Sequence, residues 1–347
     1  MKNNGAPRLQ SDGPGDHAAV VCGIGAWVPP CRVTNDDLAS RLDTSDEWIR
    51  TRTGIRQRFV VPPGMSTAHL AMEAGDRALK SAGITEVHAV VLGTTTPDRP
   101  CPATAPEVAD RLGLTGTPAF DVSAVCSGFL YGLAVGSGLI SSGTAERVLV
   151  IGAEAFSTIL DPHDRATVSV FGDGAGAMVL RRGHSCESGA LGGFSLGSDG
   201  SLADLITVRA GGSLQRSTGD EPRSEDTFFT MQGKLVFTHA VTKMVESAKA
   251  ALDLVNWRID QIDWFVGHQA NLRILRAVAE QLDLDPSRLI IYLDQVGNTA
   301  AASIPLALEN ANATATLRPG QRIVLAAFGG GATWGATTLV WPELTVV

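Results

Sequence analysis

An internal repeat restricts the fold of this chain more than any other feature of its sequence. Residues 120–126 (FDVSAVC) lead into a Gly- and Ala-rich stretch with helical character, and then into the apolar run 146–153. About 170 residues later, residues 293–298 (LDQVGN) lead into an Ala-rich stretch and then into the apolar run 321–327. Each copy predicts a strand end, a turn, a helix of small residues and a buried strand.

The segments upstream of the two copies also correspond. Val87–Val91 begins 39 residues before Cys126, and Ile262–Val266 begins 36 residues before Asn298. Spacings this similar indicate a duplicated chain, and the alternative is two generic βαβ units. In a duplicated chain Cys126 and Asn298 occupy matching positions. Both are then expected to face the crevice where the halves meet, a common ligand site in open α/β sheets.

Short apolar runs alternate with stretches of helical spacing, which predicts an α/β fold. Buried strands are predicted at Ala89–Leu92, Arg147–Ile151, Ala177–Leu180, Trp264–Val266 and Arg322–Ala326. Helices are predicted at Thr67–Ala82, Ala105–Leu112, Gly128–Ile140, Val236–Leu252 and Leu272–Leu282. The irregular segment 197–226 is expected to be a long surface insertion. We divide the chain into an expected disordered leader, residues 1–17, and two halves, 18–190 and 191–347.

Charge and composition exclude several classes of function. The formal net charge of −8 opposes a global nucleic-acid surface, whereas a local basic mouth for an anion is compatible with it. No apolar run approaches the roughly 18 residues of a membrane helix. The polar N-terminus also lacks the apolar core of a signal peptide. We therefore expect a cytoplasmic protein that binds neither membranes nor nucleic acids.

Cysteine and histidine usage argues against disulfides and metal sites. The five cysteines are odd in number and widely spaced in a chain without a secretion signal. CxxC, HxxxH and HExxH motifs do not occur, so no zinc site is expected. The Gly-rich segments 171–177 and 328–335 do not match a dinucleotide fingerprint, and no P-loop motif is present.

Three side chains at strand-to-helix turns are candidates for thiol chemistry: Cys126, His268 and Asn298. Cys126 precedes a helix whose positive end favours the thiolate, so a lowered thiol pKa is expected. His268 follows a buried strand, where an imidazole can donate a hydrogen bond or act as a base. The alternatives are a small buried cysteine, a satisfied core histidine and an asparagine that caps a helix. Together the three fit acyl transfer, in which the cysteine takes the acyl group and two donors stabilise an oxyanion.

Longer motifs connect the chain to a known family. From about Val20 to Trp341 it resembles the β-ketoacyl-ACP synthase III enzymes of the thiolase superfamily. The resemblance rests on Asp43–Arg58 (DTSDEWIRTRTGIRQR), the AVCSGF sequence around Cys126, Asp164–Ala177 (DRATVSVFGDGAGA), Gly267–Ile274 (GHQANLRI), Gly297–Leu308 (GNTAAASIPLAL) and Phe328–Gly335 (FGGGATWG). It implies a thiolase-like duplicated five-layer αβαβα fold and a homodimer.

The resemblance also implies a ping-pong mechanism. Cys126 attacks an acyl-CoA and releases CoA, a malonyl-acyl carrier protein then loses CO2, and its enolate attacks the acyl-enzyme. His268 and Asn298 match the pair that hydrogen-bonds the forming enolate. The backbone N–H groups of Cys126 and Gly330 match the donors to the acyl thioester oxygen. The implied enzyme needs no cofactor and starts a fatty acid or polyketide chain.

Two alternatives to this activity stay open. One keeps the fold and the nucleophile but transfers the acyl group to a hydroxyl or amine without decarboxylation. Asn298 argues against it, because an enzyme that forms no enolate has less need of that donor. The other is a non-catalytic partner subunit, and the presence of Cys126, His268 and Asn298 together argues against it.

Binding residues for CoA follow from the same resemblance. Trp48 and Arg165 match the pair that sandwiches the adenine, an arrangement that suits an aromatic plane and a guanidinium. The other matches to the nucleotide and pantetheine channel are Thr44, Arg52, Gly233, Phe237, Asn271 and Arg273. Arg52, Arg56 and Arg58 are expected to form a basic dock for phosphate or carrier protein, and the alternative is a plain solvated face.

Cys101 is the implied gate of the acyl pocket. In family members that prefer acetyl, a bulky aromatic residue of the partner subunit closes this pocket, 25 residues before the nucleophile. Cys101 stands there in this chain, between Pro100 and Pro102. A thiol leaves more space than a ring, and each further buried CH2 contributes about 0.8 kcal/mol, so we expect a primer of roughly four or more carbons. The alternative is that side chains near the loop 197–226 refill the space.

Overall fold

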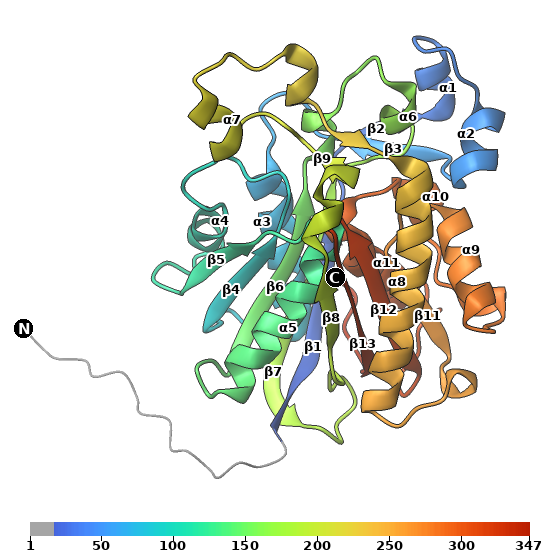
Figure 1. The fold of residues 1–347 in the computed structure, drawn as a ribbon. Coiled ribbons are helices and arrows are strands. Elements are labelled where there is room, and N and C mark those ends of the chain that lie inside the picture. The colour runs from blue at the N-terminus through green and yellow to red at the C-terminus, as the bar shows by residue number, and fades with distance from the viewer. Residues whose placement is uncertain (1–16) are drawn as a thin grey trace, which may run out of the picture.

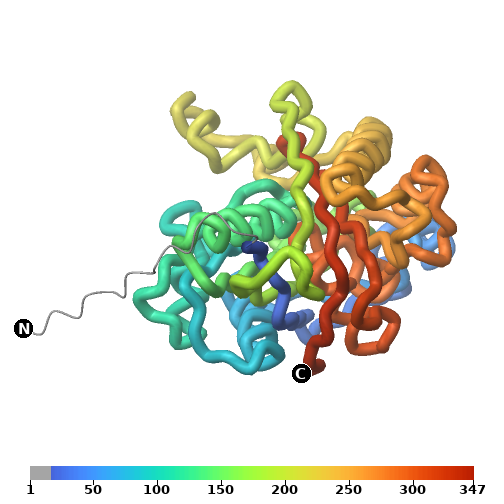
Figure 2. Tube along the Cα trace, turned by 90° about the horizontal axis from the view of Figure 1, so that it is seen from below, coloured from blue at the N-terminus to red at the C-terminus, as the bar shows by residue number. Residues whose placement is uncertain are grey.

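A computed structural model describes residues 17–347 of the chain. The expected disordered leader, residues 1–17, lies outside the described residues except for His17, with which strand β1 begins. Seen from below, most of the segments coloured blue to green lie on one side of the molecule and the orange and red segments on the other (Figure 2).

The first sheet has five strands in the order β1-β7-β6-β4-β5. β4 (Ala89–Gly93) runs parallel to β5 (Ala119–Val122) and β6 (Arg147–Glu154). β7 (Gly174–His184) runs antiparallel to β6 and to β1 (His17–Trp27). β4 and β6 are apolar and buried along almost their whole length, as expected for strands covered on both faces.

The second sheet has four strands in the order β11-β12-β13-β8. β11 (Trp264–Gly267) runs parallel to β12 (Arg322–Gly329). β13 (Thr333–Val340) runs antiparallel to β12 and to β8 (Ser195–Ser198). Two small antiparallel ribbons pair β2 (Cys31–Thr34) with β3 (Gln57–Val60), and β9 (Ile206–Thr207) with β10 (Thr230–Met231).

Helices separate and cover the two sheets (Figure 1). The central layer is α5 (Gly128–Ser141) and α11 (Ser303–Ala313), each of which contacts strands of both sheets. α3 (Thr67–Ala82) and α4 (Ala105–Arg111) cover the first sheet, α8 (Gly233–Leu254) covers the second, and α9 (Leu272–Gln281) packs against α8. The short helices are α1 (Asn35–Ala39), α2 (Asp46–Thr53), α6 (Arg165–Val168), α7 (Ser213–Thr218) and α10 (Leu293–Val296). The duplicated five-layer αβαβα fold is therefore confirmed.

The predicted strands and helices agree with the structure, with differences in the irregular segment and in the second copy of the repeat, where α10 replaces the strand end expected before Asn298. All five predicted strands lie within observed strands, and α3 has the predicted bounds. The segment 197–226 contains 3-10 turns, β9 and α7, and Ile206 of β9 reaches the central cavity described below. This segment is therefore a surface insertion only in part.

The repeat is more regular in the structure than in the sequence. Four features recur at a constant offset of 175 residues. The first residues of β4, α5 and β6 (Ala89, Gly128 and Arg147) correspond to those of β11, α11 and β12 (Trp264, Ser303 and Arg322). The positive-φ residue Val125 likewise corresponds to Ala300. In both copies a 3-10 turn, η1 (Val125–Ser127) or η7 (Ala300–Ala302), opens with a positive φ, 47° at Val125 and 43° at Ala300.

This register corrects one expectation from the sequence. Cys126 corresponds to Ala301 and not to Asn298, which lies three residues earlier in its copy. The sequence pattern aligned the two polar candidates because the positive-φ residues that define the true register, Val125 and Ala300, are apolar. Cys126 lies in the connection from β5 to α5, whereas the strand end expected at 293–298 is the short helix α10, so Asn298 lies between two helical segments that lead into α11.

A row of glycines crosses the first sheet beneath η7 and the beginnings of α5 and α11. Gly93, Gly152 and Gly176 are direct neighbours on β4, β6 and β7. A Cβ atom on Gly93 would lie 2.7 Å from the backbone carbon of Gly128, and one on Gly152 would lie 2.4 Å from the backbone oxygen of Ala301. Only glycine therefore lets η7 and the beginning of α5 lie directly on this sheet.

Replacing Gly152 tests this close contact. Gly152→Ala is expected to lower the free energy of unfolding by about 1–3 kcal/mol, because the added methyl group must displace the backbone of η7. Gly138→Ala is the matched control, since Gly138 lies exposed on α5 with open space at its Cβ position, and it is expected to be neutral or slightly stabilising. Urea unfolding measures both variants, and equal stability of the two would contradict the argument.

Candidate active site

Cys126 lies in η1, the turn that connects β5 to α5. Its side chain is 8% exposed. The end of β12 abuts this turn, because a Cβ atom on Gly329 would lie 2.7 Å from the backbone nitrogen of Cys126 and 3.0 Å from that of Ser127. The nucleophile candidate is therefore held between backbone segments of the two halves.

His268 follows β11 directly, and its backbone N–H donates to the carbonyl of Ala326 on β12. The imidazole is buried, and its Nδ1 lies 2.7 Å from Oγ of Ser303, the first residue of α11. Burial lowers the pKa of His268 to about 3, because an imidazolium would lose its hydration there. The ring is therefore neutral around pH 7.

Asn298 lies in the turn between α10 and η7 and is 4% exposed. Its Oδ1 accepts a hydrogen bond from the backbone N–H of Ala300 at 2.9 Å, which assigns the orientation of the amide. Its own backbone N–H donates to the carbonyl of Val170. With Oδ1 committed, the side-chain NH2 group is the part of Asn298 available to a bound molecule.

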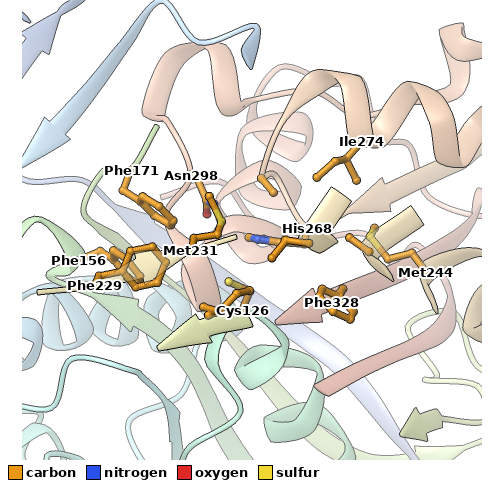
Figure 3. Close-up of a pocket in the computed structure, with 14 residues that line it drawn as sticks. Cys126, Phe156, Phe171, Phe229, Met231, Met244, His268, Ile274, Asn298 and Phe328 are labelled. Atoms are coloured by element: carbon orange, nitrogen blue, oxygen red, sulfur yellow. The ribbon is translucent and has the colours of Figure 1, made fainter. Parts of the chain in front are cut away.

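The three candidates line one narrow apolar cavity of about 40 Å³. Figure 3 shows His268 and Asn298 on one side of this cavity and Cys126 on the other. The remaining lining residues are Phe156, Phe171, Ile206, Phe229, Met231, Val236, Ala240, Met244, Ala270, Ile274 and Phe328. The structure therefore brings together the three residues that the sequence singled out, in a space almost free of other polar groups.

Three phenylalanine rings form one end of the cavity. Phe156 and Phe171 are stacked with their centroids 4.3 Å apart, and Phe229 meets both rings edge-on at 5.0 Å. Phe229 and Ile206 lie beside or within the irregular segment, so side chains from this region do contribute to the pocket wall. The sequence analysis did not select these rings as site residues: Phe171 lies within the motif 164–177 but was given no role, and Phe156 and Phe229 lie in no motif.

The expected lowering of the Cys126 pKa is wrong. Burial raises the pKa of the thiol above its ordinary value, and the nearby carboxylate of Glu154 raises it further. Cys126 lies in η1, ahead of the regular helix α5, so the helix end contributes less than the lost hydration. The resting site therefore holds a neutral thiol beside a neutral imidazole.

Glu154 is a buried acid that the sequence analysis missed. It ends β6, and its carboxylate accepts hydrogen bonds from the backbone N–H of Thr95 and the hydroxyl of Thr96. Burial raises its pKa to about 7, and these bonds and one from the Ala301 backbone oppose the shift. An acidic residue at the end of an otherwise apolar strand was the available signal.

Most of the expected CoA-binding residues line a second, open cleft of about 540 Å³. The predicted residues found there are Trp48, Arg52, Gly233, Phe237, Asn271 and Arg273. The cleft also takes in Ser169, Lys234 and Thr238, which the sequence analysis did not select. The hydroxyl of Ser169 is buried without a hydrogen-bond partner among the residues described.

Helix α2 positions Trp48 at this cleft. Ser45 caps the helix by accepting a hydrogen bond from the Trp48 backbone, and the helix ends at Gly54 with a φ of 84°. The guanidinium carbons of Arg52 and Arg165 lie 4.5 Å and 5.1 Å from the Trp48 ring centroid. Arg165 also pairs with Asp43. An adenine ring could lie between Trp48 and Arg165 only if the guanidinium of Arg165 moved away from the tryptophan ring.

Arg58 does not belong to a basic dock. Its side chain is 1% exposed and donates to the carbonyls of Val33 and Ser169 and to the side chain of Asn35. Burial lowers its pKa to about 10. The exposed Arg56 does face a neighbouring cleft of about 460 Å³, whose other arginines are Arg50, Arg273 and Arg276. The sequence pattern did not indicate that Arg58 is buried whereas Arg56 is exposed.

Three further expected positions lie outside both cavities. Thr44 does not line the cleft, and its hydroxyl is buried without a partner within residues 17–347. Cys101 is exposed in the connection between β4 and α4 and does not line the cavity of its own chain. Gly330 follows the end of β12, next to the Gly329 that abuts Cys126. Their expected roles stay predictions.

Comparison with known proteins agrees with this geometry. Residues 120–200 match the family model described as 3-oxoacyl-[acyl-carrier-protein (ACP)] synthase III, and residues 252–341 match that of its C-terminal part. β-Ketoacyl-[acyl-carrier-protein] synthase III 5 of Streptomyces coelicolor is 58% identical over 95% of this chain and 99% of its own.

Solved structures give the same result. The 3-oxoacyl-(acyl carrier protein) synthase III of Pseudomonas aeruginosa is 50% identical, with a TM-score of 0.89 over 94% of this chain and 99% of its own. The priming β-ketosynthase of a polyketide biosynthetic pathway is 30% identical, with a TM-score of 0.87 over 97% and 99%.

Residues 17–347 contain neither a membrane-spanning helix nor a metal-ligand cluster. Within residues 17–347 no helix is long and apolar enough to cross a membrane, and the same residues contain no cluster of side chains suited to a metal ion.

The sequence identity of more than half to a relative, over nearly the full length of both chains, and the shared fold decide the classification. The chain belongs to the β-ketoacyl-[acyl-carrier-protein] synthase III family of the thiolase superfamily.

Proposed function

We propose that the protein condenses an acyl-CoA primer with malonyl-acyl carrier protein and so starts a fatty acid or polyketide chain. The observation that carries this proposal is the convergence of Cys126, His268 and Asn298 on one buried apolar cavity. A thiol nucleophile opposite two neutral hydrogen-bond donors suits a reaction with an acyl-enzyme and an enolate.

In the first half-reaction the Cys126 sulfur attacks the thioester carbonyl of the acyl-CoA. A new C–S bond forms to Cys126, the C–S bond to CoA breaks, and the thiol proton leaves with the CoA thiol. Because burial keeps Cys126 neutral in the resting site, proton loss must accompany attack. The backbone N–H groups of Cys126 and Gly330 are the proposed donors to the carbonyl oxygen.

In the second half-reaction malonyl-acyl carrier protein loses CO2, and the electron pair of the broken C–C bond forms an enolate. The enolate carbon attacks the acyl carbonyl carbon, the C–S bond to Cys126 breaks, and the leaving thiolate takes up one proton from solvent to restore the thiol. His268 and Asn298, which both line the cavity, are the proposed donors to the enolate oxygen, and the low polarity of the cavity strengthens both bonds. Thioester activation and loss of CO2 supply the driving force, so this reaction needs no cofactor.

The open clefts suit the two polyanionic substrates. Trp48, Arg52 and Arg165 offer an aromatic plane and guanidinium groups to a nucleotide. The arginine-lined cleft beside them offers a positive surface to an acidic carrier protein in an otherwise acidic chain. We further propose a cytoplasmic homodimer in which the partner subunit supplies Cys101 to the acyl pocket.

Intact-mass spectrometry tests the proposed reaction. Incubation with acyl-CoA is expected to add one acyl group to the wild-type protein, and malonyl-acyl carrier protein is expected to remove it as β-ketoacyl-carrier protein. Cys126→Ala is expected to abolish both steps because it removes the nucleophile, whereas Cys186→Ala, which changes an exposed cysteine, is expected to retain them.

Two results would overturn this assignment. Acylation of the Cys126→Ala protein would place the nucleophile elsewhere. An acyl-enzyme that ignores malonyl-acyl carrier protein but transfers its acyl group to a hydroxyl or amine would identify the alternative acyltransferase.

The second half-reaction should depend on the two donors. His268→Ala and Asn298→Ala are each expected to slow decarboxylation by about 10²–10³-fold, because one enolate donor is lost, while self-acylation of Cys126 continues. Release of CO2 from malonyl-acyl carrier protein measures the first effect and mass spectrometry the second. His88→Ala, at an exposed position outside the site, is the control. A folded variant that fails to self-acylate would refute this division of roles.

The primer is expected to be larger than acetyl, at roughly four or more carbons, each CH2 contributing nearly fourfold in affinity. In competition between acetyl-CoA and longer acyl-CoAs, the wild type should prefer the longer chains and Cys101→Phe should shift the preference toward acetyl. Cys186→Phe adds the same ring at an exposed site and should change nothing. A wild-type preference for acetyl would mean that Phe156, Phe171 and Phe229 already fill the pocket.

A further inference from the structure

We infer that Ser303 is a positioning residue that sets the tautomer of His268, so that the ring N–H points into the cavity as a hydrogen-bond donor. The inference rests on the proposed condensation only for its kinetic consequence, and the tautomer itself can be observed directly. It assigns a role to a buried hydroxyl on α11 that lies behind the imidazole, on the side away from the substrate.

The geometry around Ser303 is well defined. Its Oγ lies 2.7 Å from Nδ1 of His268, and the backbone N–H of Gln269 donates to the same Oγ at 3.3 Å. Ser303 is 1% exposed, so solvent offers its hydroxyl no other partner. Across the described part of the chain, Nδ1 of His268 is also the one acceptor recorded for this hydroxyl.

The number of protons on the two side chains decides which group donates in the bond between Ser303 and His268. Oγ already receives the N–H of Gln269. If Nδ1 also donated to it, the hydroxyl proton of Ser303 would be buried without an acceptor, which is unfavourable. If the hydroxyl donates to Nδ1, then the hydroxyl, Nδ1 and the N–H of Gln269 all have partners. A neutral imidazole carries one N–H, and that N–H is then at Nε2.

The resulting tautomer fits the role proposed for His268. Figure 3 shows the ring directed toward the space between Cys126 and Asn298. Burial keeps the ring neutral, so Nε2–H acts as a donor and not as a base. It then shares the substrate oxygen with the NH2 group of Asn298, whose own orientation is assigned by the Ala300 backbone. Each donor is thus oriented by a partner on the side away from the substrate.

The internal repeat argues that a helix beginning at this position does not require a hydroxyl. Its counterpart in the first half is Gly128, the first residue of α5, which has no side chain. Both helices begin directly after equivalent 3-10 turns. A hydroxyl at this position is therefore a feature of the half that carries His268, as expected of a residue retained for the site.

Ser303→Ala tests the inference by two readouts. Release of CO2 from malonyl-acyl carrier protein by enzyme acylated with butyryl-CoA is expected to slow by roughly 10–100-fold, the usual effect of losing an orienting partner. The effect should fall on kcat with little change in KM, and the rate of self-acylation should stay within about threefold of wild type, because the first half-reaction does not use Nε2–H.

Nitrogen NMR of protein labelled at histidine reports the tautomer itself. The His268 signals are identified by their absence from His268→Ala. The wild type is expected to show Nε2 protonated and Nδ1 unprotonated, and Ser303→Ala to show a mixture or the opposite tautomer. Ser247→Ala is the matched control, since Ser247 is a buried serine on α8 whose hydroxyl donates to the backbone carbonyl of Lys243.

The inference is overturned if wild-type His268 carries its proton at Nδ1, or if folded Ser303→Ala keeps both the wild-type tautomer and the wild-type rate. It is also overturned if Ser303→Ala slows self-acylation as much as decarboxylation, which would indicate a general packing role. A wild-type enzyme that never decarboxylates malonyl-acyl carrier protein would refute the proposed function instead, and the NMR result would still decide the tautomer.

Discussion

The site depends on direct contact between backbone segments where the two halves meet. Gly93, Gly152 and Gly176 leave a strip of the first sheet without side chains, and η7 and the beginnings of α5 and α11 lie on that strip. Gly329 repeats this device at the end of β12, where it abuts the backbone of Cys126. Backbone atoms cannot change conformation as side chains do. These contacts therefore restrict the positions of Cys126 and of the turn around Asn298.

Burial then decides the chemistry of the groups placed there. It raises the pKa of Cys126 and lowers that of His268, so both groups are neutral when no substrate is bound. A neutral donor in an apolar cavity costs less to bury than an ion, and its hydrogen bond to a developing enolate is stronger than it would be in water. The charged groups that suit CoA and the carrier protein lie instead in open clefts, where water solvates them.

Glu154 shows how the polar groups around the cavity are connected. Its carboxylate binds the start of the connection between β4 and α4, which carries Cys101, and it also interacts with the backbone of η7. The connection that carries Cys101 and the turn η7 thus share one buried acid. Its hydrogen bonds oppose the pKa rise that burial causes, which leaves a carboxyl with a pKa of about 7 in the interior.

The amino-acid sequence determined the local structure and the identity of the reactive groups. Periodicity defined α3 from Thr67 to Ala82 and the buried strands, because these patterns depend only on neighbours in the chain. The repeat indicated the duplication, and the resemblance named Cys126, His268 and Asn298.

Tertiary structure alone decided the environment of those groups. The pKa of Cys126, the burial of Arg58, the partnership of Ser303 with His268 and the phenylalanine wall all arise from contacts between residues far apart in the chain. Even the register of the repeat was set by two strained turns with apolar residues, Val125 and Ala300. Desolvation and hydrogen-bond direction depend on everything that surrounds an atom, and a linear pattern records only its neighbours along the chain.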